Sequence, residues 1–283
     1  MPADLGDGIP GTALWTLWHR ALEARRPGGV LDDPRAIELV EAIDYPFAER
    51  FGEVGAFGQW QALRVLRFDE EVRRFAAARP GGTVVALGEG LETSFWRVDD
   101  GTLRWVGVDV EEMVAARAAL LPDEGGVAVG AGAGGVGDAR RRRSVAASAF
   151  DVDAWAPSVD PSRGVLVTAQ GLLMYFSRSE AHGLLGALAA RFPGAALVFD
   201  VMPAAAVARS GRPSGTGWQP PPWRWGWDAG EERALRALPG IAGLDHLPLR
   251  PGRGFFGGLA LPLATRVPGL WRGLPAVLRA RFV

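Results

Sequence analysis

The stretch Thr83-Val-Val-Ala-Leu-Gly-Glu-Gly-Leu-Glu-Thr93 decides the fold of this chain. Its apolar run ends at Leu87 and is followed by Gly88 and Gly90, which is typical of a buried parallel strand that turns sharply into a helix. Glycine lets the backbone turn tightly and approach a ligand closely. A dinucleotide-binding turn carries a third glycine, but Thr93 stands in that place here. The turn alone is therefore compatible with a cofactor loop and with an ordinary strand-to-helix connection.

Further apolar runs follow this strand, and segments with helical periodicity separate them. Strands are predicted at 105–109, 144–149, 164–168 and 195–200, and helices at 111–121 and 179–192. Strands that alternate with helices in this way predict an α/β fold with a doubly wound, mostly parallel sheet.

The first 80 residues contain helical patterns and no good strand. Helices are predicted at 11–26, 34–43 and 59–78, and Pro34 suits a first helical position because its missing N–H costs nothing there. We therefore expect residues 1–80 to form an N-terminal helical cap and residues 81–283 to form the α/β core.

Two segments have the composition of long loops. Residues 203–230 are rich in Pro, Gly and Trp, and a loop of that length in a compact domain is usually a lid or a binding loop. Residues 125–137 are mostly Gly, Ala and Val, which predicts a flexible surface insertion.

Composition excludes several classes of function. The chain has 31 basic and 32 acidic side chains, and this balance argues against an electrostatic nucleic-acid binder. It has no Cys, so it has no disulfide, thiolate zinc site or iron–sulfur cluster, and with three His we expect no metal site. The chain also contains no Lys, which removes Schiff-base chemistry.

Neither end of the chain predicts a membrane protein. The N-terminal residues lack the basic and apolar regions of a signal peptide, and proline and arginine interrupt the apolar stretch 255–271. We expect a cytoplasmic protein without a membrane partner. Its oligomeric state does not follow from the sequence.

An acidic residue ends the second predicted strand, about 20 residues beyond the glycine turn. Asp109 at this place is suited to accept both hydroxyls of a ribose, although it is also suited to cap the helix that follows. Glu89 and Glu92 within the turn would repel a diphosphate and suit a ligand with a positive charge. S-adenosylmethionine has a ribose, a sulfonium and no phosphate, so it fits this pattern better than a dinucleotide.

Four stretches together resemble the leucine carboxyl methyltransferase family. They are Thr12-Ala-Leu-Trp-Thr-Leu-Trp-His-Arg20, Leu31-Asp-Asp-Pro34, Leu87-Gly-Glu-Gly-Leu-Glu-Thr93 and Val167-Thr-Ala-Gln-Gly-Leu-Leu-Met-Tyr-Phe176. The resemblance extends from about residue 12 to residue 282, with the motifs in the family's order, and is closer to the bacterial branch that includes polyketide carboxyl O-methyltransferases.

This resemblance implies a class I methyltransferase (Rossmann-like) fold, with a seven-stranded, mostly parallel sheet, a reversed last strand and an N-terminal helical cap. It also implies an S-adenosylmethionine-dependent O-methyltransferase. The resemblance also allows a protein C-terminal carboxylate as the acceptor, but the bacterial-type composition and the apolar, Trp-rich loop favour a carboxylate, or a hydroxyl, of a small aromatic or polyketide-type metabolite.

The resemblance further implies a set of cofactor-binding residues, which includes Gly88, Gly90 and Asp109. Arg64 matches the family arginine that pairs with the cofactor's carboxylate, and Arg67 is the other candidate because the register is not fixed. Asp151, after the third strand, would contact the adenine amino group, unless it is only a turn residue. Gln170 lies where family members often carry Glu or Gln near the cofactor.

Candidates for catalysis and acceptor binding are fewer. Tyr175 is the one catalytic candidate, and packing at a helix start is its alternative role. No general base is assigned, since each His is more typical of a structural or solvated residue. This suits a carboxylic acid acceptor, which is already an anion at pH 7. Arg20 from the cap is a candidate partner for the acceptor carboxylate, and Trp223 and Trp225 are candidates to cover an apolar acceptor.

Two other functions remain possible from the sequence. A nicotinamide-dependent oxidoreductase shares the glycine turn and Asp109, but it predicts a third glycine and a proton relay that commonly uses Lys. A non-catalytic member of the family would keep the cofactor pocket as a scaffold or sensor. Binding of the cofactor without turnover would identify it.

Overall fold

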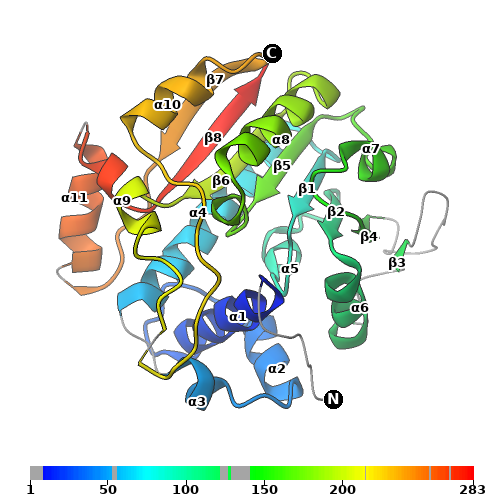
Figure 1. Cartoon of the computed structure of the whole chain (residues 1–283). Coiled ribbons are helices and arrows are strands. Elements are labelled where there is room, and N and C mark those ends of the chain that lie inside the picture. Colours follow the sequence, from blue (N-terminus) through cyan, green and yellow to red (C-terminus); the bar gives the residue numbers. More distant parts are fainter. Residues whose placement is uncertain are drawn as a thin grey trace.

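The structure is a computed structural model that describes residues 9–52, 56–121, 127–128, 141–213, 215–254, 256–267 and 269–283. Its centre is one sheet whose strands lie in the order β3-β4-β2-β1-β5-β6-β8-β7 (Figure 1). The strands are β1 (Thr83–Leu87), β2 (Arg104–Asp109), β3 (Val127–Ala128), β4 (Arg142–Ala146), β5 (Val165–Ala169), β6 (Ala196–Val201), β7 (Ile241–Leu247) and β8 (Ala276–Phe282).

The sheet confirms the predicted class I methyltransferase arrangement. β8 runs antiparallel to its neighbours β6 and β7, whereas the other described pairs are parallel. Seven strands match the prediction, and the short β3 extends the edge beside β4. β3 lies within the predicted loop 125–137, most of which falls outside the described residues.

The helices surround this sheet. They are α1 (Ile9–Arg25), α2 (Pro34–Ala42), α3 (Phe47–Phe51), α4 (Ala56–Ala78), α5 (Ser94–Val98), α6 (Glu111–Leu120), α7 (Val152–Trp155), α8 (Arg178–Arg191), α9 (Ala204–Val207), α10 (Ala229–Arg236) and α11 (Leu261–Arg266). Short turns of helix are η3 (Ala156–Ser158), η4 (Leu173–Tyr175), η5 (Phe256–Ala260) and η6 (Trp271–Gly273). Among the described helices, none combines the length and apolarity that a bilayer crossing requires.

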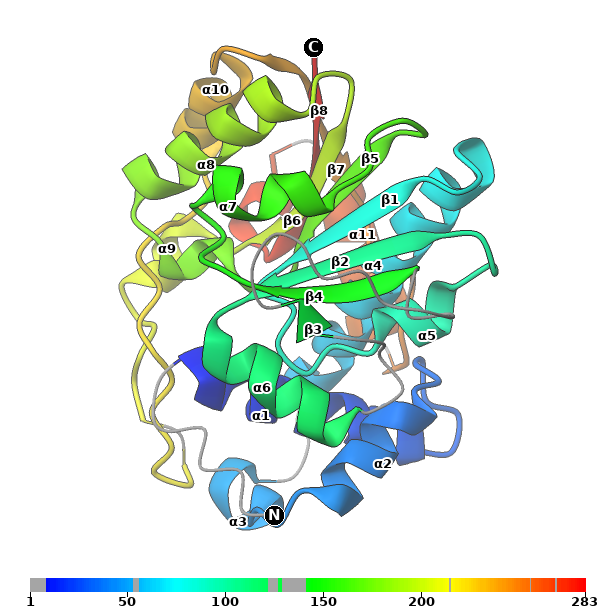
Figure 2. The same cartoon turned by 90° about the vertical axis from the view of Figure 1, so that its right-hand side faces the viewer.

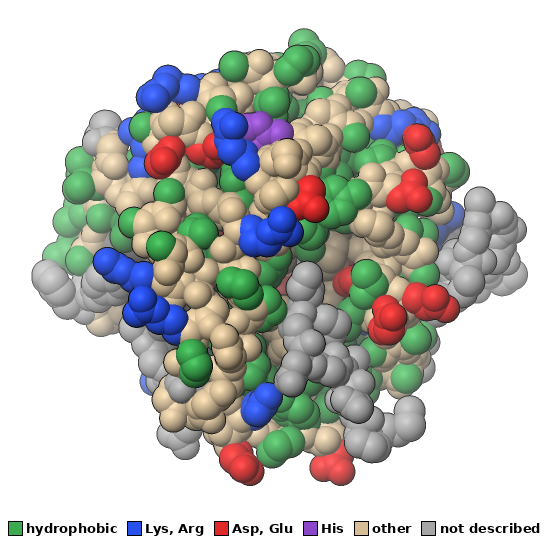
Figure 3. Space-filling model, in the orientation of Figure 1, with side chains coloured by type: hydrophobic (Ala, Val, Ile, Leu, Met, Phe, Trp, Pro, Cys, Tyr) green, Lys and Arg blue, Asp and Glu red, His purple; other side chains and the backbone are tan. Residues whose placement is uncertain are grey.

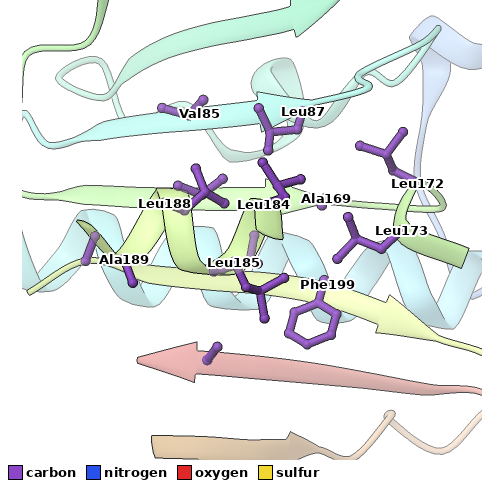
Figure 4. Packing of buried hydrophobic residues seen from close by; sticks show 14 of the residues in the cluster. Val85, Leu87, Ala169, Leu172, Leu173, Leu184, Leu185, Leu188, Ala189 and Phe199 are labelled. Carbon is purple, nitrogen blue, oxygen red and sulfur yellow. The ribbon is translucent and has the colours of Figure 1, made fainter. Parts of the chain in front are cut away.

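Alternation along β1 builds the core on both faces of the sheet. Val85 and Leu87 pack on one face in a cluster with Leu184 and Leu188 of α8, as Figure 4 shows. Val84 and Ala86 point to the other face, where they share a cluster with residues of α4. A strand that is buried on both faces has a continuous run of apolar residues, and for this reason β1 could be predicted from the sequence.

The third strand begins earlier than predicted. β4 starts at Arg142 and ends at Ala146, whereas the apolar pattern predicted residues 144–149. Arg142 is only 2% exposed, and its Nη2 lies 3.0 Å from Oε2 of Glu89, which compensates its buried charge. A buried ion pair thus places charged residues inside the strand, where a hydrophobic pattern does not find them.

Helices α1, α2 and α3 form an apolar cluster of their own, which includes Met113 of α6. Figure 2 shows these helices grouped below the sheet, beside α6. By contrast, α4 packs directly on the sheet. A cap boundary at residue 80 stays a prediction, and the packing favours a cap that ends before α4.

The segment 203–230 bridges the core and this cluster. Figure 1 shows it in yellow, running from α9 toward α3 and back. Trp218 stacks on Trp15 at a ring distance of 5.4 Å and meets Phe51 edge-on at 5.1 Å. Nearer the C-terminal end of the segment, Trp227 is 1% exposed in the core beside the sheet. Trp218 in the middle of the segment and Trp227 near its end therefore anchor it.

His19 on α1 is buried, and its Nδ1 has no hydrogen-bond partner among the described residues. Burial lowers the pKa of His19 to about 4. The ring is therefore neutral at pH 7, and protonation in the folded state is unfavourable because no group compensates the charge.

We expect this histidine to make the protein sensitive to mild acid. Between pH 6.5 and 4 the unfolded chain binds the proton more tightly, so the free energy of unfolding falls as the pH is lowered. The His19 contribution is about 2 kcal/mol at pH 5. His19→Phe keeps an aromatic ring against Trp15 and should lose less stability between pH 8 and pH 5 in urea titrations. Equal losses in both proteins would contradict this assignment.

Candidate cofactor site

A cavity of about 430 Å³ opens at the carboxyl ends of β1, β2, β4 and β5. In open α/β sheets this edge is the usual place for a ligand. Thr12, Ala13 and Thr16 of α1 contribute one wall, so a cap helix lies over the sheet edge. Figure 3 shows that basic and acidic side chains are interspersed on the face that Figure 1 presents.

The two glycines of the turn line this cavity and adopt a left-handed backbone. Gly88 has φ of 58° and Gly90 has φ of 54°, which side chains with a Cβ rarely adopt. A Cβ at Gly88 would lie 2.7 Å from Leu172 Cδ1, and one at Gly90 would lie 3.3 Å from the Cβ of Ala13. Glycine is therefore required both for the backbone conformation and for the close approach of neighbouring walls.

Asp109 also lines the cavity, as the sequence predicts. Its Oδ2 accepts a hydrogen bond from the Gly90 N–H at 2.7 Å, and its Oδ1 accepts one from the Val110 N–H at 2.8 Å. Burial raises the pKa of Asp109, while these two backbone donors act in the opposite direction. The carboxylate thus holds the glycine turn against the end of β2.

Arg64 of α4 lines the cavity, whereas Arg67 is not among its lining residues. Nη1 of Arg64 donates to Oδ2 of Asp200 at 2.7 Å, and its buried Nε has no partner among the described residues. Arg67 instead pairs with Glu70 and Glu71 on its own helix. The geometry therefore favours Arg64 as the cation that a ligand in this cavity would meet.

Gln170 follows β5 and lines the cavity. Its Nε2 donates to Oε2 of Glu92 at 2.8 Å, which fixes the orientation of its side-chain amide. Glu89 and Glu92 are not the free negative charges that the sequence predicts. Glu89 is paired with Arg142, and Glu92 is paired with arginines of α1 and α5.

The structure does not bring Asp151 into the cavity. Asp151 is exposed and caps α7, where its Oδ1 accepts from the Ala154 N–H at 3.3 Å. The preceding residues Ser148, Ala149 and Phe150 line the cavity instead. Because β4 ends earlier than predicted, Asp151 already belongs to the next helix. Asp151 thus has the local, turn-type role that the sequence left open as the alternative to adenine binding.

Arg20 is also held away from the cavity. Its Nη1 lies 2.5 Å from Oε1 of Glu92, and its Nη2 donates to the Leu91 carbonyl at 2.7 Å. It is only 2% exposed and is not among the residues that line the cavity. The protein itself thus engages this guanidinium, and a contact with an acceptor carboxylate stays a prediction.

None of Tyr175, Trp223 and Trp225 is among the residues that line the cavity, and their roles in catalysis and acceptor binding stay predictions. Tyr175 forms the end of η4, and burial raises its pKa. Trp225 is 3% exposed and belongs to the core beside the sheet, where its Nε1 donates to Glu231 at 3.0 Å. Trp223 packs half-buried against the cluster on the α4 side.

Comparison with known proteins gives this cavity its context. The leucine carboxyl methyltransferase family model matches residues 13–189, which is more than half of the chain. The chain belongs to this family.

Individual relatives agree with the assignment. The "Tetracenomycin polyketide synthesis O-methyltransferase TcmP" of Streptomyces glaucescens is 30% identical over 241 residues, which cover 83% of this chain and 80% of that protein. A protein of Mycolicibacterium gilvum (strain PYR-GCK), named "Putative S-adenosyl-L-methionine-dependent methyltransferase", is 31% identical over 226 residues, or 72% of this chain and 70% of its own length. The protein is thus an S-adenosylmethionine-dependent methyltransferase.

A solved structure supports the fold alone. A DUF574 family protein from Streptomyces avermitilis MA-4680 superposes with a TM-score of 0.57 at 14% identity, covering 99% of this chain and 100% of that one. The comparisons give no support to a nicotinamide-dependent oxidoreductase.

The residues at the cavity fit the cofactor of this family. The glycine turn leaves room for close backbone contact, Asp109 offers a carboxylate for ribose hydroxyls, and Arg64 carries a buried donor with no partner in the part of the chain that the structure describes. An arginine with free donors suits a carboxylate because a guanidinium binds two oxygens at once. The individual contacts stay predictions.

Sequence reasoning missed Asp200 and Gly171, which adjoin Arg64. Asp200 follows the apolar run Ala195-Ala-Leu-Val-Phe199 and lies one residue before the end of a buried strand, much as Asp109 ends β2. An acid at the carboxyl end of a central strand was the signal that could have identified it. Gly171 follows Gln170 directly, within the motif 167–176.

Proposed function

We propose that this methyltransferase transfers the methyl group of S-adenosylmethionine to a carboxylate of a small aromatic or polyketide-type acceptor. One observation favours a carboxylate over a hydroxyl as the methyl acceptor. Among the described residues that line the cavity, none is a histidine, and all three lining carboxylates are engaged by hydrogen bonds or ion pairs. A carboxylic acid with a pKa of about 4 needs no base at pH 7, whereas a phenol with a pKa of about 10 does.

The histidines give a phenol acceptor no further support. Burial lowers the pKa of His19 and of His246 to about 4, and His246 stacks on Trp271 at a ring distance of 4.1 Å. His182 pairs with the buried Glu231, on the side of the sheet where α8 packs. Each ring thus has a structural role.

The remaining support comes from relatives and from the chemistry of transfer. The family is named for carboxyl methylation, and one relative is named for polyketide synthesis. The cofactor supplies an electrophilic methyl group on a sulfonium. The chain has then to hold the cofactor through Arg64, Asp109 and the glycine turn, to exclude water beneath α1, and to align the acceptor.

A hydroxynaphthoic acid tests the choice of oxygen, because it carries a carboxyl and a phenol on one apolar body. Two derivatives, each with one of these groups already methylated, serve as matched acceptors. We expect a base-labile methyl ester as product, a rate at least a hundredfold higher for the acceptor with a free carboxyl, and little pH dependence between pH 6 and 9. An ether product, with a rate that rises toward the phenol pKa, would show that the acceptor is a hydroxyl.

A further inference from the structure

Asp200 is a fully buried carboxylate near the end of β6 that is not part of the cavity lining. Its Oδ2 accepts from Nη1 of Arg64 at 2.7 Å, and its Oδ1 accepts from the Gly171 N–H at 2.6 Å. Arg64 belongs to α4 and Gly171 follows β5, so they form two different walls of the cavity. One hidden carboxylate therefore ties together two residues that a ligand would touch.

The guanidinium of Arg64 is confined on further sides. Its carbon lies 5.4 Å from the centre of the Trp60 ring, one helical turn earlier. Gly171 has φ of 68°, and a Cβ there would lie 3.0 Å from Nη1 of Arg64. Any other residue at 171 would be strained and would crowd the guanidinium. The backbone at Gly171 and the carboxylate of Asp200 thus set where Nη1 lies.

The charges of this pair depend on each other. Arg64 is 4% exposed, and a buried guanidinium without a counter-ion is strongly unfavourable, as is a buried carboxylate alone. Asp200 engages Nη1, while Nε has no partner among the described residues. The pair therefore compensates the buried charge and leaves donor capacity on Arg64 for a second carboxylate.

We propose that Asp200 is a positioning residue for cofactor binding: it orients Arg64, and the loop at Gly171, to receive the carboxylate of S-adenosylmethionine. This inference rests on the proposed role of Arg64. Without Asp200, the guanidinium lacks its fixed partner and has to be ordered by the ligand, which costs affinity.

Two ligands separate this role from a merely structural one. S-adenosylhomocysteine carries the amino-acid carboxylate, and 5′-methylthioadenosine has the same nucleoside without it. Asp200→Asn keeps an oxygen acceptor for the Gly171 N–H and removes the charge that holds Arg64. In calorimetric titrations we expect this variant to bind S-adenosylhomocysteine at least tenfold more weakly, with the affinity for methylthioadenosine changed less than twofold.

A double-mutant cycle with Arg64→Gln tests whether the effect passes through Arg64. In the Arg64→Gln background, Asp200→Asn should change S-adenosylhomocysteine affinity less than twofold. If Asp200→Asn weakens both ligands equally, tightens S-adenosylhomocysteine, or acts undiminished in that background, the inference is overturned. If Arg64→Gln itself binds S-adenosylhomocysteine with full affinity, the proposed role of Arg64 is wrong as well. This result distinguishes a failure of the Arg64 role from a failure of the Asp200 inference alone.

Gly171→Ala provides the second variant, in case Asp200→Asn does not fold. It leaves both charges in place and forces the guanidinium to shift by a few tenths of an ångström. We expect a loss of threefold or more for S-adenosylhomocysteine, again without loss for methylthioadenosine. An unchanged affinity for S-adenosylhomocysteine in this variant would contradict the proposal.

Discussion

Replacing Asp109 with alanine is expected to lower the affinity for S-adenosylhomocysteine at least a hundredfold. Asp109 lines the cavity and lies beside the glycine turn, where it is placed to accept the two ribose hydroxyls. Two hydrogen bonds to a charged acceptor contribute together about 3 kcal/mol, which corresponds to a hundredfold in affinity. The variant also leaves the N–H groups of Gly90 and Val110 without their acceptor, which loosens the turn.

Asp151→Ala is the matched control for this measurement. Asp151 also follows a parallel strand of the sheet, but it is exposed and caps α7. We expect its affinity for S-adenosylhomocysteine to stay within threefold of the unaltered protein, with a loss of helix-cap stability of about 1 kcal/mol. Similar losses of affinity in both variants, measured by calorimetry, would instead support the prediction that Asp151 contacts the cofactor.

Arg97→Met is expected to have the largest effect on stability. Its guanidinium lies 2.7 Å from Oδ2 of Asp33, 2.8 Å from Oδ2 of Asp69 and 2.8 Å from Oε1 of Glu92. Its side chain is only 8% exposed, and it joins the start of α2, the middle of α4 and the glycine turn. Removing one partner of a buried ion pair leaves the other charge uncompensated. We therefore expect the free energy of unfolding to fall by about 3 to 5 kcal/mol at pH 7.

The pH dependence of this variant has a definite sign. Burial already raises the pKa of Asp69, and loss of Arg97 raises it further. When the pKa of a carboxyl is higher in the folded than in the unfolded state, the free energy of unfolding falls as the pH rises from the unfolded-state pKa to the folded-state pKa. Urea unfolding, followed by tryptophan fluorescence, should thus show a larger loss at pH 7 than at pH 5.

Arg25→Met provides the control for Arg97→Met. Arg25 forms an ion pair of 2.8 Å with Glu41 on the surface of the cap. Exposed pairs of this kind contribute less than about 1 kcal/mol, because water and salt screen them. If Arg25→Met lowers the free energy of unfolding as much as Arg97→Met does, the network around Arg97 contributes no more to stability than an exposed ion pair.

Much of the fold follows from local patterns. The strand ending at Leu87 was identified because a strand buried on both faces is continuously apolar, and α2 because Pro34 suits the first position of a helix. The predicted start of β4 was wrong because the buried Arg142, whose charge Glu89 compensates, belongs to the strand. A pattern of hydrophobicity assigns charged residues to the surface, so it fails wherever a charge is compensated inside the protein.

By itself, the sequence determined the α/β order, the glycine turn and the position of Asp109 beside it. These features depend on neighbours along the chain and on the rule that parallel strands end at one edge of the sheet. The tertiary structure alone decided which charges meet: Arg20 meets Glu92, and Arg64 meets Asp200, 136 positions away. With 31 basic and 32 acidic side chains, composition leaves these pairings open. Packing selects them, because a buried charge is stable only where the fold brings its partner within hydrogen-bond distance.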